Sequence, residues 1–280
     1  MNQELIHQTF LSKLHDNQSK LISDLYSNNP NTQFTIIPKN ILYIWHNKHK
    51  IPTEFISSMH KIKISNPEFK YFLFDIKDSQ NFLFNHFPPI FLSTYNKLIP
   101  YAYKSDFFRY AFLFIYGGIY LDIKFEPIND FKLIYLTNQE YFTLDHFSTI
   151  HDNYHPQICN GFLVVKPKNP ILFQCLQNII LHVKQNFFGS SPLDPTGPSL
   201  LFQSFPTSFK NNLQNLLHLH AYLHVTTSTN DENKIIHHLS IILKPGIEIL
   251  KTMGNHAKVQ MLLKEQPHYT ILWKNKKIYY

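Results

Sequence analysis

The chain has 280 residues, of which 44% are hydrophobic and 15% aromatic, and this composition excludes an intrinsically disordered protein. The formal net charge of +7 comes from dispersed lysines, with the densest run in the C-terminal WKNKKIYY, so we expect a solvated basic surface and no nucleic-acid-binding module. The cysteines, Cys159 and Cys175, have no metal-ligand spacing, which excludes a disulfide framework and a zinc site and favours two buried free thiols.

No targeting or membrane-spanning segment is predicted. The N-terminal MNQELIHQTFLSKLHDNQSK lacks the apolar core of a secretory signal. The longest apolar run, FFRYAFLFIYGGIYL, is too short to cross a bilayer and contains Arg109 and two glycines. We therefore expect a soluble protein that has no membrane span and acts in the cytoplasm. If the source is a virus, the location would be the host-cell cytoplasm or the virion.

The N-terminal third predicts a strand–helix–strand unit. Residues 1–35 read as a polar helical leader ending in the turn-rich SNNPNTQ. The apolar run Ile41–Trp45 suits a buried strand, IPTEFISSMHKIKISNP suits a helix with Pro52 in its first turn, and Tyr71–Phe74 suits a second strand. This order indicates a βαβ unit with parallel strands.

The middle of the chain predicts a buried helix followed by a buried strand. Short helices broken by prolines cover residues 79–98, and Ala102–Tyr116 reads as one buried helix that ends at Gly117. GIYLDIKF then begins a strand, and EYFTLDHF and QICNGFLVVKP are further strands.

The C-terminal third predicts a helix in NPILFQCLQNIILHVKQNF, a loop in GSSPLDPTGPSLLF and then short β-like runs. We expect one α/β domain over residues 36–280 with a β-rich part at about 210–280.

Two charged pairs interrupt the apolar KSDFFRYAFLFIYGGIYLDIKFEP. Asp106 and Arg109 are three positions apart on a helix and so share a face, which suits either a local ion pair or a polar face toward a ligand with hydroxyl groups. Asp122 ends a buried strand, where open α/β sheets bind ligands. Lys124 and Glu126 would point to the same side if the strand continues, and the alternative is then a charged surface strand.

This segment resembles the sugar-binding region of DxD-motif glycosyltransferases, the family 32-like group of the yeast initiating mannosyltransferase and the clostridial glucosylating toxins. The shared pattern is Ser-Asp, two residues, Arg, an apolar helix, Tyr-Gly-Gly and a strand with Asp-x-Asp. IPKNILYIWHNKHKIP resembles the opening strand of that family, and LDPTGPSLL resembles its Thr-Gly-Pro loop. The three blocks occur in family order over residues 37–205.

The resemblance implies a GT-A-like α/β fold with a mixed, mostly parallel central sheet flanked by helices. It implies transfer of a hexose from a UDP- or GDP-sugar donor to an acceptor hydroxyl of a glycan or protein, with retention of configuration. It also implies a divalent cofactor, Mn²⁺ or Mg²⁺, that holds the donor diphosphate.

The resemblance assigns roles to five residues by position. Asp106 and Arg109 would hold the donor sugar, and Asp122 would lie near the ribose and the metal ion. Trp45 falls where the nucleotide base sits, and Asn160 lies close to the sugar. Replacing Asp106 with alanine or Asp122 with asparagine should then abolish transfer and leave the fold intact.

Four further substrate-binding candidates belong to the matching blocks. Tyr116 and Gly118 are part of the Tyr-Gly-Gly block, although the glycine also suits a purely structural role in the turn. Thr196 belongs to the Thr-Gly-Pro loop. Asp194 either lines the acceptor side or only shapes a turn before a proline.

Lys124 departs from the family pattern, because it stands in the place of the second aspartate of DxD. A protonated lysine cannot bind a metal ion. Three explanations remain open: Lys124 itself neutralises the diphosphate as a catalytic residue, Asp122 holds the ion together with His268, or the protein is a degenerate nucleotide-sugar or glycan binder.

Overall fold

A computed structural model describes most of the predicted domain. The residues described are 35–145, 157–211, 219, 221–229, 235–244, 246–252 and 265–280. The helical leader predicted over residues 1–35 lies, apart from its last residue, outside the described residues. None of the helices in the described ranges has the length and apolarity needed to cross a membrane.

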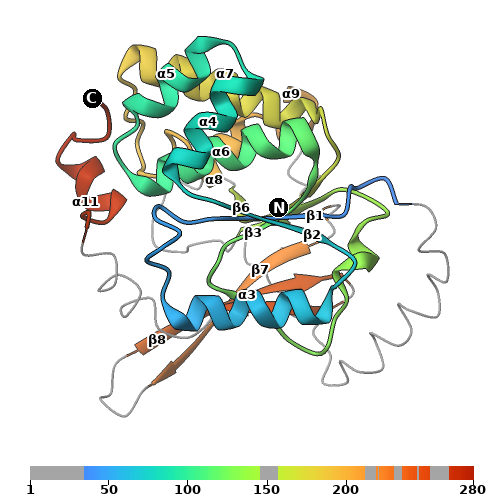
Figure 1. The fold of residues 1–280 in the computed structure, drawn as a ribbon. Helices are drawn as coiled ribbons and strands as arrows, with labels where there is room; N and C mark the ends of the chain where they lie inside the picture. Colours follow the sequence, from blue (N-terminus) through green and yellow to red (C-terminus); the bar gives the residue numbers. More distant parts are fainter. Residues whose placement is uncertain are drawn as a thin grey trace.

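Nine strands and eight α-helices make up the described part (Figure 1). The strands are β1 (Asn40–Ile44), β2 (Lys70–Phe74), β3 (Gly118–Leu121), β4 (Phe125–Pro127), β5 (Tyr141–Leu144), β6 (Ile158–Val165), β7 (Ala221–Thr229), β8 (Ile235–Leu243) and β9 (Ile247–Thr252). The helices are α3 (Thr53–Ser65), α4 (Ile76–His86), α5 (Pro89–Lys97), α6 (Tyr101–Tyr116), α7 (Pro170–Gln185), α8 (Pro198–Gln203), α9 (Thr207–Lys210) and α11 (Tyr269–Lys274), with a 3-10 turn η1 (Leu133–Leu136).

The strands form one mixed sheet in the order β2-β1-β3-β6-β5-β7-β8-β9-β4. The α/β class and the parallel β1–β2 unit are confirmed. The expectation of a mostly parallel sheet is wrong, because only β1–β2, β1–β3 and β5–β7 are parallel and the other five described pairs are antiparallel. Short connections join β7 to β8 and β8 to β9, and strands joined by short turns must run antiparallel.

Helices cover both faces of the sheet. Figure 1 shows α4 to α9 gathered on one face and α3 alone on the other. Side chains alternate along a strand, so those of β1 lie in two cores. Leu42 packs in the core on the side of α4 to α9, and Ile41 and Tyr43 pack in the core on the side of α3.

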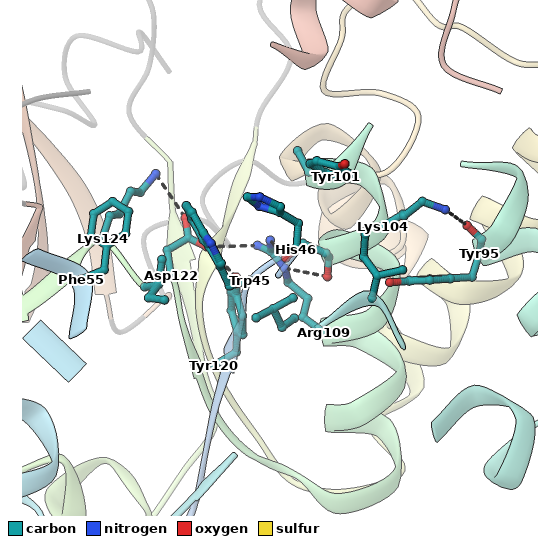
Figure 2. Close-up of a pocket in the computed structure, with 15 residues that line it drawn as sticks. Trp45, His46, Phe55, Tyr95, Tyr101, Lys104, Arg109, Tyr120, Asp122 and Lys124 are labelled. Carbon is teal, nitrogen blue, oxygen red and sulfur yellow. Dashed lines mark hydrogen bonds and ion pairs between the residues drawn. The ribbon is translucent and has the colours of Figure 1, made fainter. Parts of the chain in front are cut away.

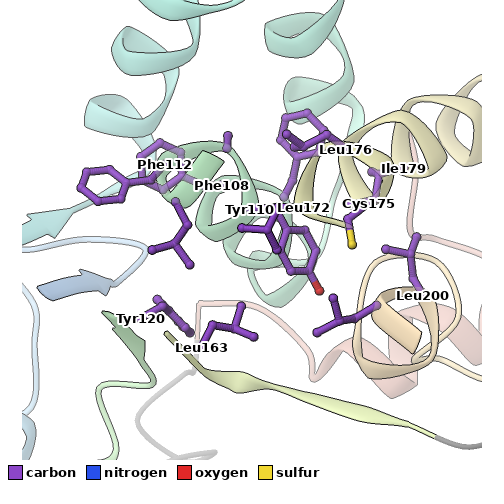
Figure 3. Packing of buried hydrophobic residues seen from close by; sticks show 14 of the residues in the cluster. Phe108, Tyr110, Phe112, Tyr120, Leu163, Leu172, Cys175, Leu176, Ile179 and Leu200 are labelled. Carbon is purple, nitrogen blue, oxygen red and sulfur yellow. The ribbon is translucent and has the colours of Figure 1, made fainter. Parts of the chain in front are cut away.

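Helix α6 lies at the centre of the larger core. Phe107, Phe108, Tyr110, Ala111 and Phe112 are all fully buried, and Figure 3 shows Tyr110 pointing between α7 and α8. A helix that is apolar on nearly all sides must be covered on all sides. The predicted buried helix is therefore confirmed, and the few polar residues on it are buried with it.

The double glycine turns the chain from α6 directly into β3. Gly117 has φ of 60°, which favours glycine, and its N–H donates to the Leu113 carbonyl at 2.8 Å. At Gly118 a Cβ atom would lie 2.5 Å from the backbone oxygen of Asn40. The turn thus lets β3 lie against β1 and brings Asp122 to the same edge of the sheet as Trp45.

The strand does not continue through Lys124. The Phe125 N–H donates to the Asp122 carbonyl at 3.0 Å and closes a turn over residues 122–125. Glu126 belongs to the next strand, β4, and pairs with Lys61 at 3.1 Å. The alternative of one charged surface strand is wrong, because Lys124 and Glu126 lie on different elements.

Candidate active site

Two cavities open at the edge of the sheet where β1 and β3 end. The first has a volume of about 240 Å³, and the second, toward β6 and β7, has about 500 Å³. Both are lined by the backbone or side chains of Ala102, Arg109, Asp122 and Lys124. These residues therefore form a shared wall, which has two cationic side chains and one carboxylate.

Trp45 and His46 line the first cavity from the end of β1 (Figure 2). The Trp45 ring packs edge-on against Phe55 with centroids 5.5 Å apart, and its N–H donates to the Lys50 carbonyl at 3.2 Å. The His46 ring stacks on Tyr101 at 4.7 Å, with an angle of 3° between the planes. This side of the shared wall is an aromatic, largely apolar slot.

Arg109 is the centre of the charged groups. Its Nη2 atom lies 3.2 Å from Asp106 Oδ1, and its Nη1 lies 3.7 Å from Asp122 Oδ1. Nη1 also donates to the Asn160 carbonyl at 2.6 Å, and the guanidinium lies 4.2 Å from the ring centre of Tyr120. Since the side chain is only 7% exposed, its orientation is held by fixed partners.

Asp106 is buried among donors. Its carboxylate accepts hydrogen bonds from Asn160 Nδ2 at 2.9 Å and from Thr196 Oγ1 at 2.7 Å, in addition to the Arg109 ion pair. Burial raises the pKa of Asp106 to about 6, because the loss of water outweighs these interactions. Above that pH the carboxylate is ionised and holds Arg109, Asn160 and Thr196 together.

Asp122 lies between two cations. Its Oδ2 is 3.2 Å from Lys124 Nζ, and Figure 2 shows Lys124 on one side and Arg109 on the other. Burial disfavours the carboxylate, but the charges of Lys124 and Arg109 outweigh it and hold the pKa of Asp122 below its usual value. The environments thus separate the pKa values of Asp106 and Asp122, a pattern typical of functional sites.

Tyr120, Asp145 and Tyr269 are site residues that sequence reasoning missed. The Tyr120 hydroxyl donates to Asp122 Oδ1 at 2.7 Å, and its position two residues earlier on the strand could have revealed it. Asp145 and Tyr269 line the second cavity. Asp145 directly follows β5 as Asp122 follows β3, and β3 and β5 both run antiparallel to β6, so their ends meet at one edge.

Three of the predicted residues have other surroundings. Tyr116 and Gly118 lie at the opposite ends of α6 and β3 from Arg109 and Asp122, and they line neither cavity. Asp194 Oδ2 accepts hydrogen bonds from the N–H groups of Ser190 and Ser191, at 2.8 and 2.9 Å, as expected of a residue that shapes a turn. The structure therefore brings together Trp45, Asp106, Arg109, Asp122, Lys124, Asn160 and Thr196.

The predicted metal site does not suit a divalent ion. Lys124 Nζ contacts the Asp122 oxygen that faces away from Arg109. His268 caps α11, and burial together with the nearby charge of Lys124 lowers its pKa. Within the described ranges, no group of three His, Cys, Asp or Glu side chains could hold a metal ion. Hard divalent ions need several oxygen ligands, so Asp122 and His268 form an incomplete donor set.

Lys104 is a buried lysine in the wall of the first cavity. Its Nζ donates to the Tyr95 carbonyl at 2.7 Å in the last turn of α5, and no carboxylate in the described ranges pairs with it. Burial lowers the pKa of Lys104 from 10.5 to about 8. Between these values the unfolded chain binds more protons than the folded one, so stability should rise with pH there.

Replacing Lys104 with methionine should remove this rise. Between pH 7.5 and pH 10 the free energy of unfolding of the wild type should rise by about 2 kcal/mol more than that of the variant. Urea unfolding at each pH measures both values. Lys97→Met, which changes an exposed lysine at the end of α5, is the matched control. Curves for wild type and Lys104→Met that run parallel across this range would contradict the assignment.

The amino-acid sequence of the chain is similar to those of known proteins. Residues 15–143 match the family described as glycosyltransferase sugar-binding region containing DXD motif. The chain is 33% identical over 204 residues to an uncharacterized glycosyltransferase of Acanthamoeba polyphaga mimivirus, covering 71% of this chain and 77% of that protein. It is 30% identical over 100 residues to inositol phosphoceramide mannosyltransferase 3 of Schizosaccharomyces pombe, covering 36% of this chain and 26% of that one.

A solved structure with a similar fold supports this relationship. The PaToxG glycosyltransferase superposes with a TM-score of 0.50 at 17% identity, covering 75% of this chain and 83% of that one. The likeness shows a GT-A-like fold.

Proposed function

The chain belongs to the family of glycosyltransferases with a DXD-containing sugar-binding region, and from this premise we propose that it transfers a hexose from a UDP- or GDP-sugar to a hydroxyl group of a glycan or protein. The transfer retains the configuration at the anomeric carbon, as the family resemblance implies. Family members typically use a divalent metal ion with their DXD motif. In this chain the predicted Mn²⁺ or Mg²⁺ ligands, Asp122 and His268, form an incomplete set.

The observation that carries the proposal is the wall shared by the two cavities. A nucleotide sugar has an aromatic base at one end, a diphosphate in the middle and a sugar at the other end. The first cavity offers Trp45, the shared wall offers Arg109 and Lys124, and the second cavity offers Asp106 and Asn160. The order of these groups matches the order of chemical groups along the donor.

The charged residues suit the bond that must break. In the transfer, the bond from the anomeric carbon to the diphosphate oxygen breaks, the acceptor oxygen bonds to that carbon and its proton leaves to the diphosphate. Negative charge grows on the departing diphosphate, and preorganised cations next to it lower the barrier. Arg109 is fixed by Asp106 and Asn160, and Lys124 is placed by Asp122.

We propose a cytoplasmic site of action, in the host cell if the source is a virus. The free, buried state of Cys159 and Cys175 supports a reducing compartment. The mimivirus relative supports a viral setting.

Release of nucleoside diphosphate from a panel of UDP- and GDP-hexoses tests the function. The purified protein is incubated with each donor, once with Mn²⁺ and once with EDTA, and UDP or GDP is measured by chromatography. We expect release from one donor above all others. No release from any donor in either buffer, from a folded protein, would contradict the transferase assignment.

A catalytically degenerate binder of nucleotide sugars or glycans is the second candidate function. The observation that favours it is Lys124 in place of the second aspartate of the DXD motif. Such a protein would bind UDP or GDP and release none from any donor, so calorimetric binding beside the release assay distinguishes the two functions.

A further inference from the structure

We propose that Lys124 replaces the divalent metal ion, so that the protein binds the diphosphate of its donor through a built-in cation and needs no metal. This inference rests on the proposed donor class and concerns the chemistry of the same site. The ligand of Lys124 is the diphosphate of a nucleoside diphosphate or nucleotide sugar.

Charge conservation is the first argument. An aspartate that holds a divalent ion contributes a net charge of +1 to the diphosphate site, and a protonated lysine contributes the same charge. One substitution in the DXD motif therefore removes both the ligand and the need for the ion that it would hold. A change to a neutral residue would have removed the positive charge altogether.

The position of Lys124 is the second argument. The turn over residues 122–125 brings its Nζ to 3.2 Å from Asp122 Oδ2, and the side chain is 29% exposed. It lines both cavities, as Arg109 and Asp122 do. One carboxylate thus holds the ammonium group, which has three N–H donors. The N–H groups that Asp122 does not use can donate hydrogen bonds to a phosphate oxygen in the cavities.

The occupied carboxylate is the third argument. A divalent ion needs oxygen ligands at 2.0–2.6 Å, and the Asp122 oxygens are already used by the Tyr120 hydroxyl on one side and by Lys124 on the other. An ion bound to Oδ2 would share this oxygen with the ammonium group of Lys124, and two cations bound to one oxygen atom repel each other. Asp122 therefore positions Lys124 where relatives of the chain position a metal ion.

Binding of UDP and GDP measured by isothermal titration calorimetry, in EDTA and in Mn²⁺, tests the inference without requiring turnover. Wild type should bind the nucleoside diphosphate with the same affinity in both buffers. Lys124→Met should lose about 10- to 100-fold in affinity in both, the value of a charge-assisted hydrogen bond. Lys124→Asp, which restores Asp-x-Asp, should bind weakly in EDTA and recover at least about 10-fold in Mn²⁺.

Direct binding of Mn²⁺ adds a readout that does not depend on measuring the affinity for the nucleotide. Because UDP and GDP bind Mn²⁺ themselves, the reference is the electron paramagnetic resonance signal of free Mn²⁺ with the nucleotide alone. Adding Lys124→Asp should lower the signal below this reference, and adding wild type should not. Lys61→Met is the matched control, because Lys61 also pairs with a carboxylate, Glu126 at 3.1 Å, but lies outside both cavities. Circular dichroism confirms that each variant is folded.

The outcomes separate this inference from the proposed function. Wild-type binding that requires Mn²⁺, or unchanged binding by Lys124→Met in EDTA, would overturn the role of Lys124 even if transfer occurs. Metal-free binding that Lys124→Met abolishes would support it even if no donor is turned over. No binding of UDP or GDP in either buffer would overturn both.

Discussion

Replacing Asp106 with alanine should lower the free energy of unfolding by about 3–5 kcal/mol, because it leaves the Arg109 guanidinium buried without its nearest carboxylate. The Asp106 and Arg109 side chains are only 10% and 7% exposed, so the guanidinium is poorly solvated once its partner is lost. Thr196 would also lose its acceptor, and Asn160 would keep only the Tyr110 hydroxyl. Asp106→Ala was expected from sequence alone to spare the fold, and the burial of its side chain leads to the opposite expectation.

Urea unfolding followed by circular dichroism measures this effect. Glu126→Ala is the matched control, since it breaks the Lys61–Glu126 ion pair on a more exposed surface and should cost about 1 kcal/mol or less. Asp106→Asn keeps the shape of the side chain and removes only its charge, so it should lie between the two. Equal midpoints for Asp106→Ala and Glu126→Ala would show that the Asp106–Arg109 pair does not stabilise the fold.

Replacing Asp122 with asparagine should lower donor turnover by about 100-fold or more, the size of effect expected when a preorganised electrostatic group is lost. The amide keeps the volume but removes the charge that places Lys124 at 3.2 Å and that lies 3.7 Å from Arg109. Both cations would then point less accurately at the departing diphosphate.

The rate of nucleoside diphosphate release at saturating donor is the measurement. Asp122 is 24% exposed, so the variant should unfold at a urea concentration closer to that of wild type than Asp106→Ala does. Glu126→Gln, four residues further along the chain, should keep the wild-type rate. A wild-type rate with Asp122→Asn would remove this residue from the catalytic machinery.

Comparison of the two aspartates shows which parts of the site could be predicted. The spacing of Asp106 and Arg109 on a helix placed them on one face, and this contact is confirmed at 3.2 Å. The position of Asp122 at the end of a strand is confirmed as well. These features depend on local geometry, because the period of a helix or a strand determines which near neighbours meet.

Features of the site that depend on contacts between distant segments could not be predicted from the sequence. Asp145 follows β5 and Tyr269 begins α11, and only the order of the strands and the packing of α11 bring them to the cavity with Asp122. Tyr116 and Gly118 lie within the matching motif, but the turn between α6 and β3 places them at the far end from the cavities. A motif match identifies types of residue at given positions and does not separate those that shape a turn from those that line a cavity.

The sequence by itself determined the α/β class, the buried helix ending at Gly117, the glycosyltransferase family and the substitution of Lys124 for the second aspartate, because each is a local pattern or a chemical identity. The tertiary structure alone decided the mostly antiparallel pairing of the sheet, the two cavities with their shared wall, and the turn that places Lys124 against Asp122. These features depend on contacts between residues far apart in the chain. The free energies of such contacts come from packing and electrostatics between elements, so they produce no periodic pattern in the sequence of a single helix or strand.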